Sequence, residues 1–190
     1  MTRPVRVGGR TILADGTSMI WSVAEGRRGR RWRAVTTRDG SAETDLLIET
    51  NSDGRATRLE VATASGLLTL HPETDGSTLH GNTVTTAGIR HHALPWGPSH
   101  VLLVERSPLS DAAAVGPLAG RLGVGEGAWF GSVVVDGALV PRVGQALVVR
   151  VAPSTFTIAT PTVGEERTVV VDAVGLPAGR AASTWDLEPG

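Results

Sequence analysis

Short apolar segments separated by turn residues are the feature of this sequence that most restricts its fold. Strand-length runs rich in Val, Thr, Ile and Leu recur at a spacing of roughly ten residues. Examples are SMIWSVAE (18–25), TRLEVATA (57–64), GSVVVDG (131–137) and TFTIAT (155–160). The 24 Gly and 11 Pro residues are spread along the whole length and do not gather in one linker. This pattern is typical of an antiparallel all-β protein.

The runs predict two kinds of strand. Apolar Leu59 and Val61 alternate with charged Arg58 and Glu60, as expected for a strand with one face toward a core. The run 133–135 is Val on both faces, so we expect it in the middle of a sheet with both sides covered.

Turn residues connect several of these strands in order. The pairs Asp39-Gly40 and Asp75-Gly76, and the triplet Ser52-Asp53-Gly54, offer the positive φ angles that hairpins need. Residues 36–63 are therefore predicted to be consecutive strands of a meander.

Residues 107–122 (SPLSDAAAVGPLAGRL) differ from the rest because they are rich in alanine. Ser110 and Asp111 are candidate N-caps, and Pro117 is expected to break the helix. A lone helix among strands usually plugs or caps the β structure. We therefore predict one all-β domain over 1–190, a curved antiparallel sheet or incomplete β-barrel with a short helical insert at 107–122. Residues 1–18 are either an extension before a start at Met19 or an early strand pair.

Composition excludes several classes of chemistry. The chain has no cysteine, which removes disulfides, thiolate metal sites and cysteine nucleophiles. Its 18 basic residues are all arginine, so no lysine is available for Schiff-base chemistry. The net charge of −1 predicts neither a nucleic-acid nor an anionic-membrane partner. No apolar run suits a secretory signal or a transmembrane segment, and a cytoplasmic location is the expectation.

Residues 90–100 (RHHALPWGPSH) gather three of the five histidines together with a tryptophan and two prolines. If 95–98 is a hairpin turn, His91 and His100 share one face, and Glu105 offers a third group for a metal or an acid–base site. The segment has no HxH pair, no helical HExxH and no nucleophile motif. The alternatives are a polar hairpin with a solvent-facing turn, or a set of ligand contacts.

A second polar cluster is EGRRGRRWRAV (25–35), in which arginines surround Trp32. It resembles a basic patch for nucleic acid, but it also fits a solvated hairpin that turns at Gly26 and Gly29. Because the overall charge is slightly negative and no second basic run is present, we expect no nucleic-acid binding. We expect no catalytic residue, metal ligand or cofactor either. The candidate ligand-binding residues are Arg90, His92, Trp96 and His100, with Trp32 and Arg106 as further candidates.

Several features together resemble a family of small bacterial cytosolic proteins described as glycolipid-binding. They are Met19-Ile20-Trp21 in an early strand, Trp32-Arg33 after a turn, the meander 36–63, Ser107–Ser110, and the stretch from Gly116 to Gly123. The resemblance implies an incomplete β-barrel with a helical insert, related in shape to periplasmic lipoprotein carriers. It further implies a cavity for a lipid-like ligand and no catalysis.

This chain departs from the family at several points. The family has a Thr-Pro-aromatic-Thr segment and a Leu-Pro-Ile-Arg-Arg-Leu stretch near 107–122. Here Leu and Pro occur in a different order, and Asp111-Ala112 replaces a Thr/Asn pair. The tyrosines near the end of the family's sequences are absent. The resemblance identifies no binding residue.

The sequence thus favours a non-catalytic protein that binds an amphipathic small molecule, with a glycolipid as one candidate. One alternative is an enzyme that uses His91, His92 or His100, with Glu105 and a divalent metal. Another is a structural or interaction domain whose strand edges pair with another chain. The oligomeric state is left open.

Overall fold

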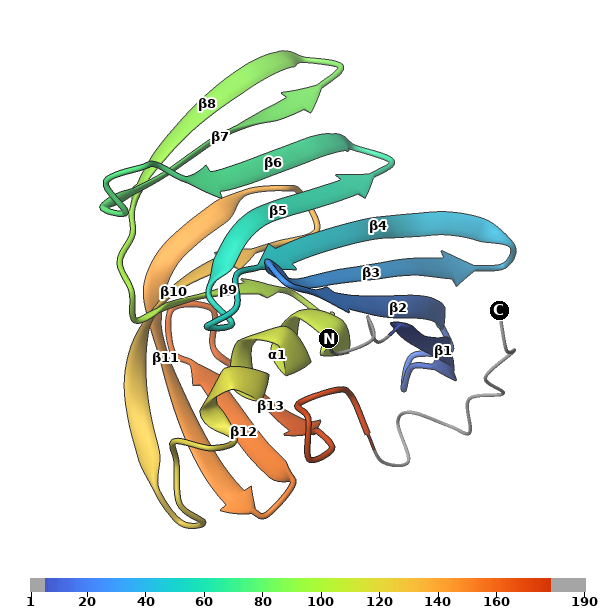
Figure 1. Cartoon of the computed structure of the whole chain (residues 1–190). Coiled ribbons are helices and arrows are strands. Elements are labelled where there is room, and N and C mark those ends of the chain that lie inside the picture. The colour runs from blue at the N-terminus through green and yellow to red at the C-terminus, as the bar shows by residue number, and fades with distance from the viewer. Residues whose placement is uncertain (1–5, 179–190) are drawn as a thin grey trace.

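The computed structural model describes residues 6–178, whose strands form two sheets around a short helix (Figure 1). Sheet A is an antiparallel meander of eight strands in chain order, β1 to β8. Its strands are β1 (Arg6–Ile12), β2 (Ser18–Gly26), β3 (Gly29–Arg38), β4 (Ser41–Thr50), β5 (Ala56–Thr63), β6 (Gly66–Pro72), β7 (Thr78–Thr85) and β8 (Gly88–Pro95). The predicted meander over 36–63 is confirmed as part of β3, β4 and β5.

Sheet B has five strands in the order β13-β12-β11-β10-β9. They are β9 (His100–Val104), β10 (Gly127–Val135), β11 (Pro141–Ala152), β12 (Thr155–Thr160) and β13 (Glu165–Val170). β9 and β10 pair in parallel, and the other neighbours pair in antiparallel. A parallel pair needs a long crossover connection, which here contains α1 (Pro108–Val115) and the 3₁₀ turn η1 (Gly116–Leu118).

The helix lies in the concave space between the sheets, where it packs against β9, β13 and β3 (Figure 1). Its N-cap is Ser107, in extended conformation, and the Ser107 side chain accepts a hydrogen bond from the Ser110 amide at 3.3 Å. The predicted caps Ser110 and Asp111 are therefore wrong. Pro108 takes the first helical position, so the cap is Ser107, three residues before Ser110. The predicted break near Pro117 is confirmed, since α1 ends at Val115.

The inner faces of both sheets and one side of α1 form a continuous apolar core. Sheet A contributes Leu46, Ile48, Leu59, Leu68 and Leu70, and sheet B contributes Val134, Val148, Phe156 and Ile158. Val133–Val135 of β10 are all buried between β11 and β9, as their two-sided apolar pattern predicts. The all-β fold is therefore confirmed, as a large curved sheet facing a second, curled sheet.

The predicted hairpin at 95–98 is wrong. β8 pairs with β7 in sheet A, whereas β9 pairs with β10 in sheet B, so the segment between them crosses from one sheet to the other. Pro95 and Pro98 would both fall next to the turn, where a hairpin needs amide donors that proline lacks. The Trp96 amide instead donates to the Ser77 carbonyl at 2.9 Å.

The barrel is not closed within residues 6–178, since no ladder joins β1 to β13 or β8 to β9. β1 pairs along its length with β2. Within the same part of the chain, no helix is long and apolar enough to cross a membrane.

Candidate functional site

A cavity of about 460 Å³ lies at the seam between β1 and β13. This volume is within the range of small-molecule sites, roughly 300–1,000 Å³. Most of its walls are apolar, and they include Ile12, Leu13, Met19, Trp21, Pro108 and Val169. The cavity therefore occupies a place where the two sheets stay apart.

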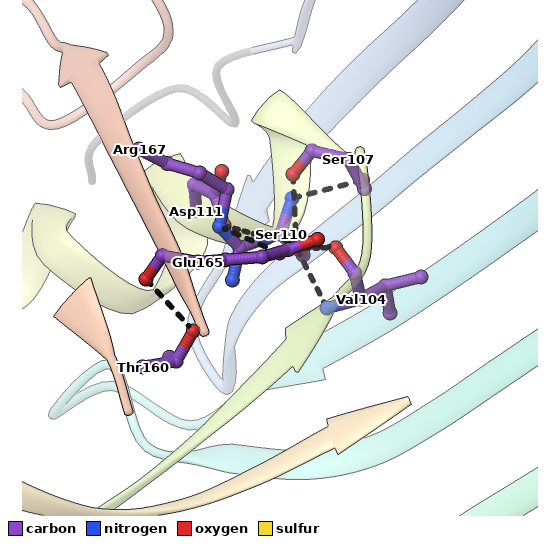
Figure 2. Close-up of polar contacts among 7 residues, drawn as sticks. All are labelled: Val104, Ser107, Ser110, Asp111, Thr160, Glu165 and Arg167. Carbon is purple, nitrogen blue, oxygen red and sulfur yellow. Dashed lines mark hydrogen bonds and ion pairs between the residues drawn. The ribbon is translucent and has the colours of Figure 1, made fainter. Parts of the chain in front are cut away.

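Two of the charged side chains that line this cavity are mostly buried, Arg167 from β13 and Asp111 from α1 (Figure 2). Arg167 Nη1 is 3.2 Å from Asp111 Oδ1, and Arg167 Nε is 3.7 Å from Glu165 Oε2. The side chains of Arg167 and Asp111 are only 14% and 6% exposed. The cavity thus combines apolar walls with a buried ion pair.

The alternation of β13 places Arg167 in the interior. Arg167 and Val169 point to the same face, and their cross-strand partners on β12 are the buried Ile158 and Phe156. Asp111 lies in the first turn of α1, where the helix dipole favours a negative charge. Two unrelated local patterns therefore bring opposite charges together in the core.

Hydrogen bonds of the Ser110 side chain attach the first turn of α1 to the end of β9 (Figure 2). Its buried hydroxyl accepts from the Val104 amide at 3.0 Å and donates to the Ser107 carbonyl at 2.9 Å. The Val104 carbonyl in turn accepts a hydrogen bond from Arg167 Nη1 at 3.2 Å. This network sets the position of Asp111 and holds one end of the guanidinium.

The guanidinium of Arg167 has more donors than the described residues satisfy. Its Nε and Nη2 are buried and make no hydrogen bond within residues 6–178. Asp111 Oδ1 accepts none there either, so its contact with Nη1 is an ion pair without hydrogen-bond geometry. A buried polar group left unpaired costs about 1–3 kcal/mol. The buried ion pair in the cavity wall is therefore incompletely hydrogen-bonded within the described residues.

Asp111 titrates near neutral pH. Burial raises the pKa of Asp111 to about 7, and repulsion from Glu165 adds to this effect. Attraction to Arg167 and a hydrogen bond with Ser110 oppose the rise in pKa. Around neutrality its carboxyl is thus either a charged acceptor or a neutral donor.

Arg106 and Asp15 also line the cavity. Arg106 has a φ of 58°, in the left-handed region that is uncommon for residues other than glycine, and its side chain is 77% exposed. Arg106 Nη1 is 3.8 Å from Asp15 Oδ2, which also contacts Arg38 at 3.0 Å. A hydrogen bond from the Thr17 amide is the main cause of the lowered pKa of Asp15. Of the six predicted ligand-binding residues, Arg106 is the one that lines this cavity.

Trp32 is buried in the core, in β3. The guanidinium of the neighbouring Arg30 is 5.9 Å from the centre of its ring, and Arg30 Nε pairs with Glu25 at 3.0 Å. Arg31 Nε pairs with Glu49 at 2.8 Å. Acidic partners thus balance part of the predicted basic cluster, and the hairpin turns at Gly26 and Gly29 as expected.

Arg90 and His92 lie on the edge strand β8, with His92 facing inward. His92 Nε2 is 2.8 Å from the hydroxyl of Thr83, which donates to the Leu139 carbonyl at 3.1 Å. His91 faces outward, and its Nδ1 contacts Asn82 Oδ1. The two histidines therefore lie on opposite faces of the sheet.

Trp96 and His100 lie on the crossing between the sheets. Their ring centres are 5.3 Å apart, and the imidazole of His100 fills the space where Gly131 has no side chain. Burial lowers the pKa of both His92 and His100. Within residues 6–178, no three His, Cys, Asp or Glu side chains are grouped to hold a metal. Ligand contact by Arg90, His92, Trp96 or His100 stays a prediction.

The sequence interpretation missed both members of the buried ion pair. The sequence predicts Asp111 only as a candidate helix cap, and Arg167 is not among its candidate residues. A usable signal was present for Arg167. In TFTIAT and EERTVV, two-residue alternation places Arg167 on the same face as Val169, opposite an apolar row of the neighbouring strand.

Comparison with known proteins supports the fold. No family model and no curated protein matches the sequence. Among solved structures, the fold is similar to a crystal structure of a DUF1089 family protein from Pseudomonas aeruginosa, with a TM-score of 0.52 and 17% sequence identity. The match covers 93% of this chain and 88% of the other. At this identity the similarity extends to the fold alone.

Proposed function

We propose that this protein binds an amphipathic small molecule without changing it chemically. The apolar part of the ligand lies against Met19, Trp21 and Val169, and its polar head lies against Arg167 and Asp111. The observation that carries the proposal is an apolar cavity whose wall contains a buried and incompletely hydrogen-bonded ion pair.

An apolar tail can supply most of the affinity. Each buried methylene contributes about 0.8 kcal/mol, so a ten-carbon tail would contribute about 8 kcal/mol before the costs of ordering. Before those costs, that energy corresponds to a dissociation constant of about 1 μM, which is the tightest binding the tail alone could give. The head group then needs only a few polar contacts to fix its orientation.

A glycolipid meets these requirements and is the ligand that the sequence resemblance implies. A sugar hydroxyl can accept a hydrogen bond from Arg167 and donate one to Asp111. Arg106 would contact the head group where the cavity opens. Trp32, Arg90, His92, Trp96 and His100 remain proposed contacts from the sequence, outside the seam cavity.

The test is binding of a nonionic amphiphile, decyl glucoside, measured by calorimetry, together with native mass spectrometry of the purified protein. Ile12→Trp fills part of the cavity from β1, where Ile12 is 69% exposed. Ile20→Trp is the matched control, because Ile20 is 56% exposed on β2 and does not line the cavity.

We expect Ile12→Trp to weaken binding at least tenfold and Ile20→Trp to leave it unchanged. Absence of both a co-purified lipid and any binding of decyl glucoside or decanoate would overturn the proposal. Equal effects of the two tryptophans would place the ligand elsewhere.

A further inference from the structure

The outer face of sheet B, which points away from α1, differs from the rest of the surface in its composition. Arg167 of β13 contacts Asp111 of α1, so the face that carries Arg167 and its cross-strand partner Ile158 is the inner one. The residues between them in sequence point outward. Within the described strands β10, β11 and β12, the outward residues are small, apolar or neutral polar, and none is charged.

A large aromatic side chain lies in the middle of this uncharged face. Trp129 of β10 is 55% exposed, beside Leu147 of β11. The outer face of sheet A is different, because ion pairs such as Arg31–Glu49 and Arg58–Glu60 lie across it. The centres of protein–protein interfaces are depleted of charge and enriched in tryptophan. The outer face of sheet B therefore has the composition of a contact surface.

The register of sheet B makes this face complementary to itself. The inward residues Ala128, Val148 and Ile158 lie side by side in one row across three strands. On the outer face, each has a larger neighbour on one side along its strand and a smaller one on the other. These pairs are Trp129 and Gly127, Leu147 and Val149, and Thr157 and Ala159.

A two-fold axis that runs along this row, parallel to the sheet, lays a second copy over the first with its strands antiparallel. It places Trp129 over the partner's Gly127, and Leu147 over the partner's Val149. Gly127 is exposed, and a Cβ built there would meet only atoms of β11. The space above Gly127 is therefore open to the partner's indole ring.

The same axis keeps like charges apart. On β13 the outward neighbours of Arg167 are Glu166 and Thr168, so the axis places Glu166 over the partner's Thr168, whose hydroxyl can donate to a carboxylate. The net charge of −1 leaves little repulsion between whole chains. A phospholipid surface is a poorer match, because this face has no arginine on β10, β11 or β12 and an acidic residue on β13.

We propose that the outer face of sheet B binds a second copy of this chain across this two-fold axis, with Trp129 of each protomer against the partner's Gly127. A stable interface buries about 800 Å² per partner from about 20–30 residues, whereas this face offers roughly a dozen. The dimer is therefore weak, with a dissociation constant on the order of 10 μM. The face lies on the opposite side of sheet B from the seam cavity, so this dimer is independent of the proposed function.

The experiment is sedimentation velocity on the full chain from about 1 to 300 μM. We expect the wild type to shift from monomer to dimer across this range. Trp129→Arg places two cations near the axis and should weaken the dimer at least tenfold. Ile20→Arg is the matched control, because Ile20 is 56% exposed on the outer face of sheet A, and this variant should dimerise as the wild type does.

A second variant on the same face guards against a folding defect in Trp129→Arg. Thr157→Glu adds a charge two strands away from Trp129 and should weaken the dimer at least fivefold. A wild type that stays monomeric at every concentration overturns the proposal, and so does a dimer that both variants leave intact. A monomer that instead binds neutral phosphatidylcholine vesicles, and loses this binding in Trp129→Arg, also overturns it and assigns the face to a lipid surface.

Discussion

Two places where the sheets fail to join use polar side chains in different ways. At the crossing from β8 to β9, His91 and His92 each face a side-chain partner, Asn82 and Thr83. At the seam between β1 and β13, Arg167 is buried with two nitrogens that make no hydrogen bond in the described chain. In the first region, which looks reactive in the sequence, the buried His100 Nδ1 also makes no hydrogen bond in the described chain. At the seam, which looks ordinary in the sequence, Arg167 Nε, Arg167 Nη2 and Asp111 Oδ1 all make none there.

This difference shows that the hydrogen-bond partners of a polar side chain are more informative than the number of polar side chains in a short segment. A cluster of histidines and a tryptophan in eleven residues suggests chemistry, but side chains on alternate faces of a strand need not meet. A buried donor without an acceptor costs stability, and such a group is expected where a ligand supplies the missing acceptor. Measurements of stability and of amphiphile binding on variants of the two regions test this difference.

The largest expected effect is on the pH dependence of stability. The pKa of Asp111 rises in the folded protein from 3.8 to about 7, so the folded state binds more protons than the unfolded state across this window. Raising the pH from 4 to 7 should therefore lower the free energy of unfolding through this group, by roughly 4 kcal/mol at most.

Urea denaturation of wild type and Asp111→Asn from pH 4.5 to 7.5 measures that contribution. The variant should gain stability relative to wild type as the pH rises. Parallel curves of stability against pH for wild type and Asp111→Asn would show that folding does not raise the pKa of Asp111. The seam would then not differ from the β8 edge in this respect.

The second prediction concerns the cation of the same pair. Arg167→Met leaves the Asp111 carboxylate buried without its counter-charge, which should cost about 3 kcal/mol at pH 8 and less at pH 5.5, where Asp111 is neutral. Arg58→Met is the matched control, because its exposed pair with Glu60 should contribute less than about 1 kcal/mol. Chemical denaturation of both variants at both pH values is the measurement. Similar losses of stability in Arg167→Met and Arg58→Met would show that the buried pair contributes no more than a surface pair.

The sequence predicted the fold well because its signals are local. Period-two alternation and Asp-Gly turns identified the meander, and the alanine-rich stretch identified the helix that ends before Pro117. The hairpin at 95–98 failed because β9 pairs in parallel with β10 across a crossover, and no neighbouring residue encodes that pairing.

The candidate site was harder to predict because it depends on distant contacts. Asp111 and Arg167 are far apart in the sequence and meet only when α1 packs against β13. Arg106, a candidate from the sequence, lines the cavity, and its contact with a ligand stays a prediction. The alternation around Arg167 indicates an inward-facing charge but not its partner, and Asp111 carries no comparable signal.

The third prediction concerns ligand length and is smaller in free energy. If the tail lies in the apolar seam, shortening an amphiphile from decyl to octyl removes two methylenes, or about 1.6 kcal/mol. The dissociation constant should then rise by about tenfold. Calorimetry with octyl and decyl members of one series is sufficient. Equal affinities would mean that the tail stays in water and that the seam is not a tail site.

The smallest effect is expected at the β8 edge. His92→Ala removes a hydrogen bond to Thr83, but the Thr83 hydroxyl keeps its bond to the Leu139 carbonyl, so the loss should be about 1 kcal/mol. Decyl amphiphiles should bind this variant as they bind wild type, because His92 does not line the seam cavity. Denaturation and calorimetry measure the two quantities. A loss of binding free energy larger than the loss of folding stability would indicate that His92 contacts the ligand, and it would favour ligand contact by Arg90, Trp96 and His100 as well. The substitution would then act mainly on a contact that forms only in the complex.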